Sequence, residues 1–249
     1  MARKAKSNPK SEKAPTEIDI KRFTGFTGSV RLPGSKSIAN RVLLLSALGR
    51  GRVRIENVPD ADDVQVMIRA LAELGVDLQS KSGNIEISGN AGPIPVDAAE
   101  INLDNAGTAL RPLCAVLAAG HGTYTIDGNE QMRKRPIGDL VRALRQLGVQ
   151  IECRNSNYPP VTIHADGVAG GNATISGSVS SQFVSALLMM APLIEPGNRL
   201  TIELKNDPVS KPYIDLTLFL MKDFGVDVER DGFIRFIIDS GQYDNPGSY

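Results

Sequence analysis

The sequence predicts an α/β domain in which a helix–strand–helix–strand unit occurs three times. Two observations lead to this prediction. A segment with helical periodicity that ends in Gly-Val recurs at intervals of 73 and 77 residues, and a more uniformly apolar helical segment precedes each copy. Three units of about 70–77 residues account for the chain from about residue 30 onward.

The amphipathic segments have one apolar face each. They span residues 62–78, 135–151 and 211–228. Counted back from Gly75, Gly148 and Gly225, positions −11, −8, −7, −4 and −1 form one side of an α-helix. These positions hold Val64, Met67, Ile68, Leu71 and Leu74, then Ile137, Leu140, Val141, Leu144 and Leu147, then Ile214, Thr217, Leu218, Met221 and Phe224. Thr217 is the only mismatch. Each glycine is expected to form a left-handed helix cap, after which valine opens a strand.

A second set of helices is expected to be buried. These segments span residues 35–51, 106–122 and 180–197. Each begins with small polar residues, continues apolar on nearly every side and ends near a glycine, which is typical of a buried helix. Strands are expected after them at Arg52–Glu56, Tyr124–Ile126 and Leu200–Leu204, with further strands at Asn84–Ser88, Val161–His164 and Phe233–Ile238.

Composition excludes several classes of protein. The 249 residues are 41% hydrophobic and 22% charged, as in ordinary globular proteins. Because 28 Lys and Arg balance 28 Asp and Glu, a nucleic-acid-binding role is not favoured, and the apolar runs are too short to span a membrane. The cysteines Cys114 and Cys153 and the histidines His121 and His164 lack the spacing of a metal site or a disulfide framework, which indicates a reducing, cytoplasmic compartment. Residues 1–16, with five Lys or Arg, are expected to be a disordered basic tail.

The starts of the three buried helices predict a site for a polyanion. They read Ser35-Lys36-Ser37, Ala106-Gly107-Thr108 and Ser180-Ser181-Gln182. A helix N-terminus offers free N–H groups and about half a positive charge. With threefold symmetry the three starts would meet at one surface. Cations follow close by, at Lys36, Arg41, Arg111, Arg135 and Lys211. The alternative is that Ser and Thr serve only as helix caps.

Arg41 and Arg111 stand inside otherwise apolar helices, which supports the same interpretation. A buried guanidinium is costly unless it is paired, and a bound phosphate or carboxylate would supply the partner. The alternative for each arginine is a structural salt bridge to Asp62, Asp63 or Asp104.

Six motifs resemble one enzyme family. They are LPGSKSIANRVLLLSAL (32–48), NAGTALRPL (105–113), RKRPIGDLV (133–141), NYPPV (157–161), GSVSSQFVSALLMMAPL (177–193) and SKPYIDLTLFLMKDFGV (210–226). In this order they closely resemble the 5-enolpyruvylshikimate-3-phosphate synthase family, from about residue 17 to the end of the chain. The resemblance implies transfer of the enolpyruvyl group from phosphoenolpyruvate to the 5-hydroxyl of shikimate 3-phosphate. Phosphate is released, no metal or organic cofactor takes part, and glyphosate is the family's inhibitor.

The resemblance also implies the site residues. The catalytic residues would be Lys36, Arg135 and Gln182. Shikimate 3-phosphate would be bound by Lys36, Ser37, Arg41, Ser180, Ser181, Gln182, Ser210, Lys211 and Tyr213. Phosphoenolpyruvate would be bound by Lys36, Asn105, Gly107, Arg135 and Gln182. Inhibitor sensitivity would depend on Gly107, Thr108 and Pro112.

The implied fold has two similar domains, each made of three βαβαββ units with buried helices and outward-facing sheets. This chain matches the N-terminal half. Residues 17–33 are expected to form a strand segment that belongs in relatives to the other domain, and residues 34–249 the substrate-binding domain. Its units would span about 34–104, 105–175 and 176–249. The missing C-terminal half supplies the acid/base carboxylates in relatives, so it is the expected partner of an otherwise monomeric chain.

The sequence leaves two alternative functions open. The first is an isolated binding module that holds shikimate 3-phosphate and catalyses nothing. The second is the sibling transferase that acts on UDP-N-acetylglucosamine. That sibling carries a cysteine in the loop before its Arg-Pro, whereas Asp127–Lys134 contains none.

Overall fold

The computed structural model describes residues 17, 19, 21–30, 32–81 and 83–249. The chain divides into two units, Met1–Leu32 and Pro33–Tyr249, and each is considered by itself. The basic tail expected at residues 1–16 lies outside the described residues.

The strand expected at residues 17–33 is not found among the described residues of the N-terminal unit. Among its described residues from Glu17 to Leu32, none belongs to a strand, and the side chains of Phe23 and Phe26 are exposed. A strand needs a neighbour that bonds its backbone N–H and C=O groups. Without such a neighbour, the apolar residues of this segment stay in solvent.

The helices of the second unit fall where the sequence patterns place them. They are α1 (Lys36–Leu48), α2 (Asp62–Glu73), α3 (Gly107–Ala118), α4 (Gly138–Gln146), α5 (Ser181–Met190) and α6 (Lys211–Asp223), with short 3-10 turns at Met132–Lys134 and Ala191–Leu193. In α2, α4 and α6 only one face is buried. Gly75, Gly148 and Gly225 have φ of 80°, 87° and 83°, which confirms the left-handed caps.

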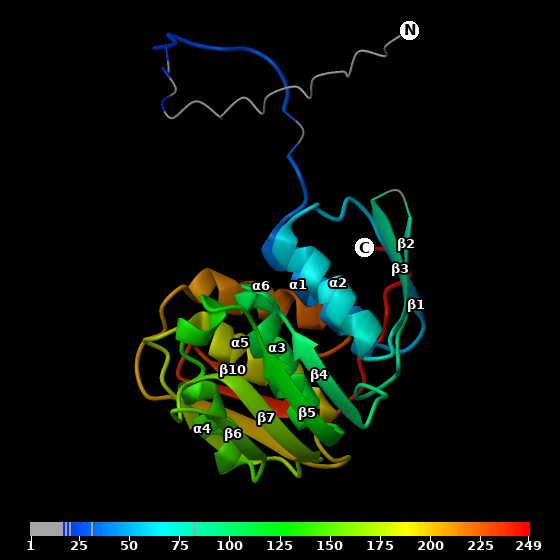
Figure 1. Ribbon diagram of the computed structural model, residues 1–249, viewed down its shortest axis with the longest axis vertical. Coiled ribbons are helices and arrows are strands. Elements are labelled where there is room, and N and C mark those ends of the chain that lie inside the picture. Colours follow the sequence, from blue (N-terminus) through cyan, green and yellow to red (C-terminus); the bar gives the residue numbers. More distant parts are fainter. Residues whose placement is uncertain (1–16, 18, 20, 31, 82) are drawn as a thin grey trace, which may run out of the picture. The chain divides into compact units, whose positions relative to one another are not determined.

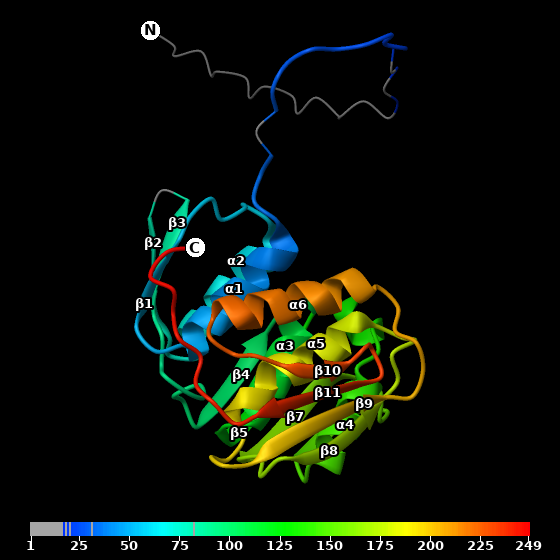
Figure 2. The same cartoon turned by 180° about the vertical axis from the view of Figure 1, so that it is seen from behind.

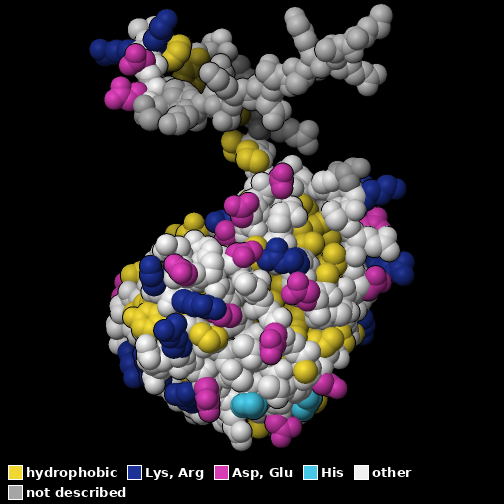
Figure 3. Space-filling view, viewed as in Figure 1, with side chains coloured by type: hydrophobic (Ala, Val, Ile, Leu, Met, Phe, Trp, Pro, Cys, Tyr) yellow, Lys and Arg dark blue, Asp and Glu magenta, His cyan; other side chains and the backbone are white. Residues whose placement is uncertain are grey.

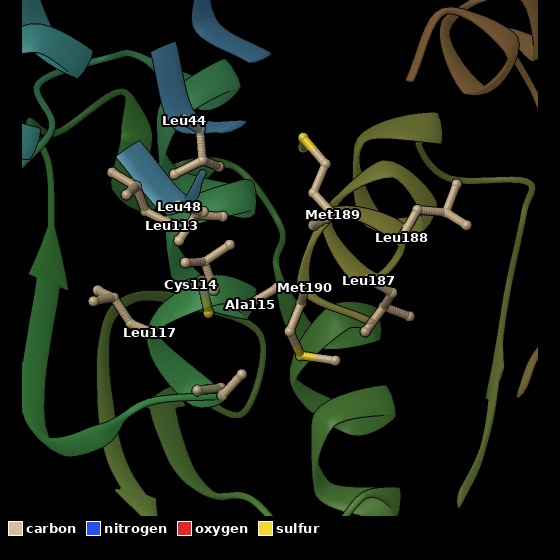
Figure 4. Close-up of a cluster of buried hydrophobic side chains, with 14 of the residues drawn as sticks. Leu44, Leu48, Leu113, Cys114, Ala115, Leu117, Leu187, Leu188, Met189 and Met190 are labelled. Carbon is tan, nitrogen blue, oxygen red and sulfur yellow. The ribbon is translucent and has the colours of Figure 1, made fainter. Parts of the chain in front are cut away.

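The helices α1, α3 and α5 form the centre of the core, because they are apolar all round. Figure 4 shows side chains that all three helices contribute to one buried cluster, among them Leu44 and Leu48 from α1, Leu113 from α3 and Met189 from α5. Each is fully buried, and burying a side chain of this size contributes about 1.5–3 kcal/mol. Cys114 is a fully buried member of the same cluster, and this burial raises the pKa of its thiol to about 12.

Three sheets surround these helices (Figures 1 and 2). The strands are β1 (Arg52–Ile55), β2 (Asp77–Lys81), β3 (Asn84–Ser88), β4 (Ala98–Asn102), β5 (His121–Asp127), β6 (Gln150–Arg154), β7 (Tyr158–Asp166), β8 (Gly171–Ile175), β9 (Arg199–Leu204), β10 (Glu229–Asp231) and β11 (Arg235–Asp239). The strand orders are β1-β3-β2, β4-β5-β7-β6 and β8-β9-β11-β10. One face of each sheet is exposed, as in β3, where Ile85 and Ile87 are buried and Glu86 is not. Buried helices and outward sheets are the arrangement that the family resemblance implies.

Each of the two four-stranded sheets begins with a strand that the sequence patterns assign to the preceding repeat. Strand β4 pairs in parallel with β5, and β8 pairs in parallel with β9. The second and third sheets therefore draw their strands from 98–166 and 171–239, and the boundaries near 104 and 175 cut each first strand away from its sheet. Neither β4 nor β8 carries a strong alternating pattern of its own, and the long-range pairing defines them.

The first sheet is completed by the last residues of the chain. In place of a strand like β4, the segment 243–249 runs parallel to β1, with Arg50 N donating to Tyr243 O at 2.7 Å and Arg54 N to Gly247 O at 2.9 Å. Tyr243 is fully buried, and its hydroxyl donates to the carbonyl of Met189 at 3.0 Å. Each of the three repeats thus combines a segment in parallel pairing, a buried helix and an antiparallel hairpin.

Candidate functional site

Four helix starts meet at one cavity of about 390 Å³. It lies where α1, α3, α5 and α6 begin. The lining residues are Lys36, Ser37, Arg41, Thr108, Pro112, Val179, Ser180, Ser181, Gln182, Ser185, Val209, Ser210 and Tyr213. The convergence expected from the repeat is therefore present, and the start of α6 joins the other three.

Local sequence leaves backbone donors available at these starts. Ser35 and Ser180 cap α1 and α5, since each side chain accepts a hydrogen bond from the backbone N–H of Ile38 or Gln182. The starts of α3 and α6 have no side-chain cap, and Ser210 before α6 adopts a left-handed conformation with φ of 56°. Uncapped N–H groups together with the helix dipoles favour an anion.

Arg41 lines the cavity from α1 and is 7% exposed. Its Nε donates to Thr217 Oγ1 at 2.8 Å, its Nη1 to the carbonyl of Ser37 at 2.9 Å and its Nη2 to Ser185 Oγ at 3.4 Å. Burial lowers the pKa of Arg41 to about 10, so the side chain keeps its charge at neutral pH. Among the described residues, only neutral groups hold this charged guanidinium.

Lys36 also lines the cavity and belongs to a polar chain. Its ammonium lies 3.4 Å from Asp63 Oδ2, and the hydroxyl of Thr108 donates to the same oxygen at 2.7 Å. Thr108 in turn accepts from Asn40 Nδ2 at 2.7 Å. Asp63 thus links the cation of α1 to the first turn of α3.

Arg111 is 4% exposed and lies beside a second cation, Arg135. Its Nη2 donates to the carbonyl of Pro136 at 3.2 Å, while its Nε and Nη1 have no partner among the described residues. Burial, with Arg135 nearby, lowers the pKa of Arg111 to about 10. A Cβ added at Gly107 would collide with Arg111 Nη1 and come within 2.9 Å of Arg135 Nη1.

The alternative of a structural salt bridge fails for both buried arginines. In the part of the chain that the structure describes, neither Arg41 nor Arg111 forms an ion pair with a carboxylate. Asp63 pairs with Lys36, and Asp104 pairs with Arg69 at 2.8 Å. Two of the three carboxylates considered as partners are therefore engaged elsewhere, and Asp62 is exposed on the first turn of α2.

Most residues expected at the site line this one cavity. They are Lys36, Ser37, Arg41, Thr108, Pro112, Ser180, Ser181, Gln182, Ser210 and Tyr213. Asn105, Gly107 and Arg135 form a separate cluster at the start of α3, where Arg135 Nη1 donates to the carbonyl of Asn105 at 3.1 Å. Lys211 does not line the cavity, because it pairs with Asp207 at 2.6 Å and lies over the ring of Phe233.

Four polar residues that support the site were not assigned to it from the sequence. Ser185 and Thr217 hold Arg41, and Asn40 and Asp63 hold Thr108 and Lys36. The signal for Thr217 was its place as the one polar residue in an apolar face. Ser185 stands in the apolar run of α5 in the same way, and Asn40 lies one helical turn after Lys36.

The charges of the cavity differ from those of the surface. Lysines, arginines and carboxylates are interspersed over the face in Figure 3, in keeping with a net charge of zero. The described residues that line the cavity include two cations and no carboxylate. Over the same described ranges, no cluster of His, Cys, Asp and Glu could hold a metal ion, and no helix has the length and apolarity to cross a membrane. The geometry therefore defines a site for an anionic small molecule.

Comparison with known proteins identifies the family of the chain that carries this site. The fold matches solved EPSP synthase structures from Acinetobacter baumannii, one with a TM-score of 0.77 at 23% sequence identity, covering 89% of this chain and 48% of that chain. Residues 20–248 match the family described as EPSP synthase (3-phosphoshikimate 1-carboxyvinyltransferase), and the chain belongs to this family.

Curated relatives agree with that assignment. A 3-phosphoshikimate 1-carboxyvinyltransferase from Shewanella amazonensis is 52% identical over 236 residues, which covers 93% of this chain and 55% of the relative. One of the same name from Klebsiella pneumoniae is 50% identical over 227 residues, covering 89% and 52%. The chain spans about half the length of the curated relatives it matches.

Proposed function

We propose that this chain is the N-terminal, shikimate 3-phosphate-binding half of a 3-phosphoshikimate 1-carboxyvinyltransferase. In the reaction, the 5-hydroxyl of shikimate 3-phosphate gives its proton to a base as its oxygen bonds to C2 of phosphoenolpyruvate, and C3 takes up a proton from an acid. The tetrahedral intermediate then breaks its C2–O bond to phosphate and loses a proton from C3. The product carries the enolpyruvyl ether, and inorganic phosphate leaves.

The cavity residues divide by the part of the substrate that each would hold. Ser180, Ser181 and Ser210 bind the 3-phosphate, together with the N-terminus of α5. Arg41 and Ser37 bind the carboxylate side, and Tyr213 lies against the ring. Gln182 and Lys36 stand between the two substrates, and the ammonium of Lys36 neutralises or protonates phosphoenolpyruvate.

Phosphoenolpyruvate is assigned to the cluster at the start of α3. Asn105, Gly107 and Arg135 bind it, with Lys36 and Gln182 reaching from the cavity. Gly107 in this cluster, with Thr108 and Pro112 in the lining of the cavity, would set the sensitivity to glyphosate. Lys211, engaged with Asp207, has weaker support as a phosphate ligand than the cavity residues.

The observation that carries the proposal is the buried cation without a counterion. Arg41 is held by neutral hydrogen-bond acceptors at the edge of a carboxylate-free cavity. A buried charge of this kind is costly unless a ligand of opposite sign completes it. Shikimate 3-phosphate carries both a phosphate and a carboxylate, which suits a cavity lined by the cations Lys36 and Arg41 and by the N-terminus of α5.

The absence of a carboxylate from the described lining of the cavity favours a second candidate for the chain by itself, namely a binding module without activity. Proton transfer at C3 requires an acid and a base, and the described lining of the cavity contains no carboxylate. A separate C-terminal half would supply those groups and exclude water when it closes over the cavity. This half is the partner that the proposal requires; we propose a monomeric enzyme in the cytoplasm.

Calorimetric titration and an assay of phosphate release test the proposal. The pure chain is titrated with shikimate 3-phosphate and with phosphoenolpyruvate, and phosphate release is measured with and without a purified C-terminal half. We expect binding of shikimate 3-phosphate by the chain alone, weaker binding of phosphoenolpyruvate, and turnover only with both halves. Turnover by the chain alone would contradict the division of roles, and the absence of recovered turnover would favour the binding module.

Lys36→Ala is the informative variant in the reconstituted enzyme. Loss of a charge-assisted contact to the substrates should cost about 1.5–3 kcal/mol in binding, in addition to any loss of proton transfer, so we expect turnover to disappear. Lys81→Ala is the matched control, because Lys81 is exposed at the end of β2 and lines no part of the cavity. Near-normal turnover by Lys36→Ala would show that the assigned role is wrong.

A further inference from the structure

Thr217 departs from the pattern that the other two units follow. It lies on the buried face of α6 with Ile214, Leu220 and Met221, and it is 0% exposed. The equivalent positions of the first and second units hold Met67 and Leu140, both buried and apolar. A buried hydroxyl at a position that packs well as a hydrocarbon elsewhere in the molecule calls for a specific partner.

That partner is Arg41. Thr217 Oγ1 accepts from Arg41 Nε at 2.8 Å, and it lies 2.8 Å from both the carbonyl oxygen of Tyr213 and Ser185 Oγ. The carbonyl can only accept, so the hydroxyl proton of Thr217 goes to Tyr213, and Ser185 donates to Thr217. Both acceptor sites of the hydroxyl are then filled, one of them by the guanidinium.

This arrangement fixes the rotation of the guanidinium. Thr217 on α6 holds Nε, the carbonyl of Ser37 on α1 holds Nη1, and Ser185 on α5 lies near Nη2. A guanidinium has five N–H groups, and three are used by these acceptors, so two are left for a ligand. The geometry points to Thr217 as a positioning residue, which orients Arg41 toward the anionic substrate without touching that substrate. The inference rests on the proposed function, in which Arg41 binds shikimate 3-phosphate.

A hydroxyl suits this task better than a carboxylate. An acidic residue at position 217 would neutralise Arg41 and compete with the substrate for its N–H groups. A hydrocarbon would leave Nε buried without an acceptor and free the guanidinium to turn. The neutral oxygen accepts one bond from Arg41 and leaves the full positive charge of the guanidinium available to a ligand.

Two variants separate the hydroxyl from the shape of the side chain. Thr217→Val keeps the branched shape and removes the hydroxyl, whereas Thr217→Ser keeps the hydroxyl and removes the methyl group. Each is titrated calorimetrically with shikimate 3-phosphate, beside the unchanged chain, Arg41→Met and the double variant Thr217→Val with Arg41→Met. Thermal unfolding of every variant is recorded in parallel.

We expect Thr217→Val to bind shikimate 3-phosphate roughly tenfold more weakly, as an unpaired buried donor predicts, and Thr217→Ser to bind within about threefold of the unchanged chain. The double variant should bind no more weakly than Arg41→Met alone, because Thr217 acts through Arg41. A purely structural role would instead give additive losses and similar losses for Val and Ser.

The outcomes separate this inference from the proposed function. If the unchanged chain does not bind shikimate 3-phosphate, the proposed function is overturned, and this inference falls with it. If it binds, then an unaffected Thr217→Val variant or additive losses in the double variant overturn this inference alone. Should Thr217→Val fail to fold, Ser185→Ala replaces it in the same cycle, since Ser185 contacts both Thr217 and Arg41; here too, additive losses overturn the inference.

Discussion

The two buried arginines show how one residue type can be held in two different ways. Arg41 and Arg111 are 7% and 4% exposed, and burial lowers the pKa of each to about 10. Every nitrogen of Arg41 has an acceptor, provided by α1, α5 and α6. Arg111 has one hydrogen bond, to Pro136, and a second cation, Arg135, as its neighbour.

The difference teaches that burial alone does not tell what an arginine is for. The surroundings of Arg41 orient it at the edge of the cavity, as a binding group requires. Those of Arg111 leave two nitrogens without a partner among the described residues, which costs stability. Four substitutions sharpen or break this comparison.

The largest effect is expected from Arg41→Met. Methionine fills most of the same volume but offers no N–H group to an anion. Because charge-assisted hydrogen bonds contribute about 1.5–3 kcal/mol each, binding of shikimate 3-phosphate should weaken by roughly 10- to 100-fold. Calorimetric titration measures this loss. Unchanged affinity would remove Arg41 from the proposed site.

Arg111→Met should stabilise the chain instead. It removes two unpartnered donors and a buried charge next to Arg135, at the loss of one hydrogen bond to Pro136. We expect a gain of about 1–2 kcal/mol in the free energy of unfolding, measured by urea titration, with shikimate 3-phosphate affinity unchanged. The same substitution at Arg41 should give a smaller gain or a loss. A lower stability for Arg111→Met would mean that its guanidinium has a partner after all.

Gly107→Ala tests how closely the guanidinium groups occupy the start of α3. The added methyl would displace Arg111 and Arg135, so we expect a loss of about 1 kcal/mol in stability. Phosphoenolpyruvate and glyphosate should bind more weakly, and shikimate 3-phosphate almost as before. In an Arg111→Met background the loss should become smaller, because only Arg135 then crowds the added methyl. Urea titrations of both pairs measure how much of the loss remains.

The smallest effect is expected from Asp63→Asn. The amide keeps an oxygen that can accept from Thr108 but loses the ion pair with Lys36, whose side chain is 47% exposed. Such half-exposed pairs contribute under about 1 kcal/mol, so shikimate 3-phosphate affinity should change by less than about fivefold. Asp62→Asn is the matched control, as Asp62 is exposed beside it on the first turn of α2. Equal effects of both substitutions in calorimetry would show that Asp63 has no particular role.

Much of the fold could be predicted because it depends on local pattern. The period of 3.6 residues located α2, α4 and α6, and the Gly-Val steps located their ends. Uniformly apolar segments that end near a glycine located α1, α3 and α5, since all these features act within a few residues. The expectation that the helix starts converge followed from the repeat alone. Most residues inferred from the motifs line the cavity that these starts form.

Other features could not be predicted, because they depend on residues far apart in the chain. Strands β4 and β8 join the sheets that follow them, and segment 243–249 completes the sheet of β1, through hydrogen bonds that no local pattern encodes. Asp63 pairs with Lys36 rather than with a buried arginine for the same reason.

The sequence by itself determined which segments become helices, which faces they bury and which polar residues stand at their starts. Only the tertiary structure decided which acceptor meets which donor. Thr217 is 176 residues from Arg41, and their contact exists because α6 packs beside α1 and α5 in the folded domain. Patterns of apolar residues specify burial within one helix. Hydrogen bonds between helices depend on distances and angles that are fixed only when the core packs.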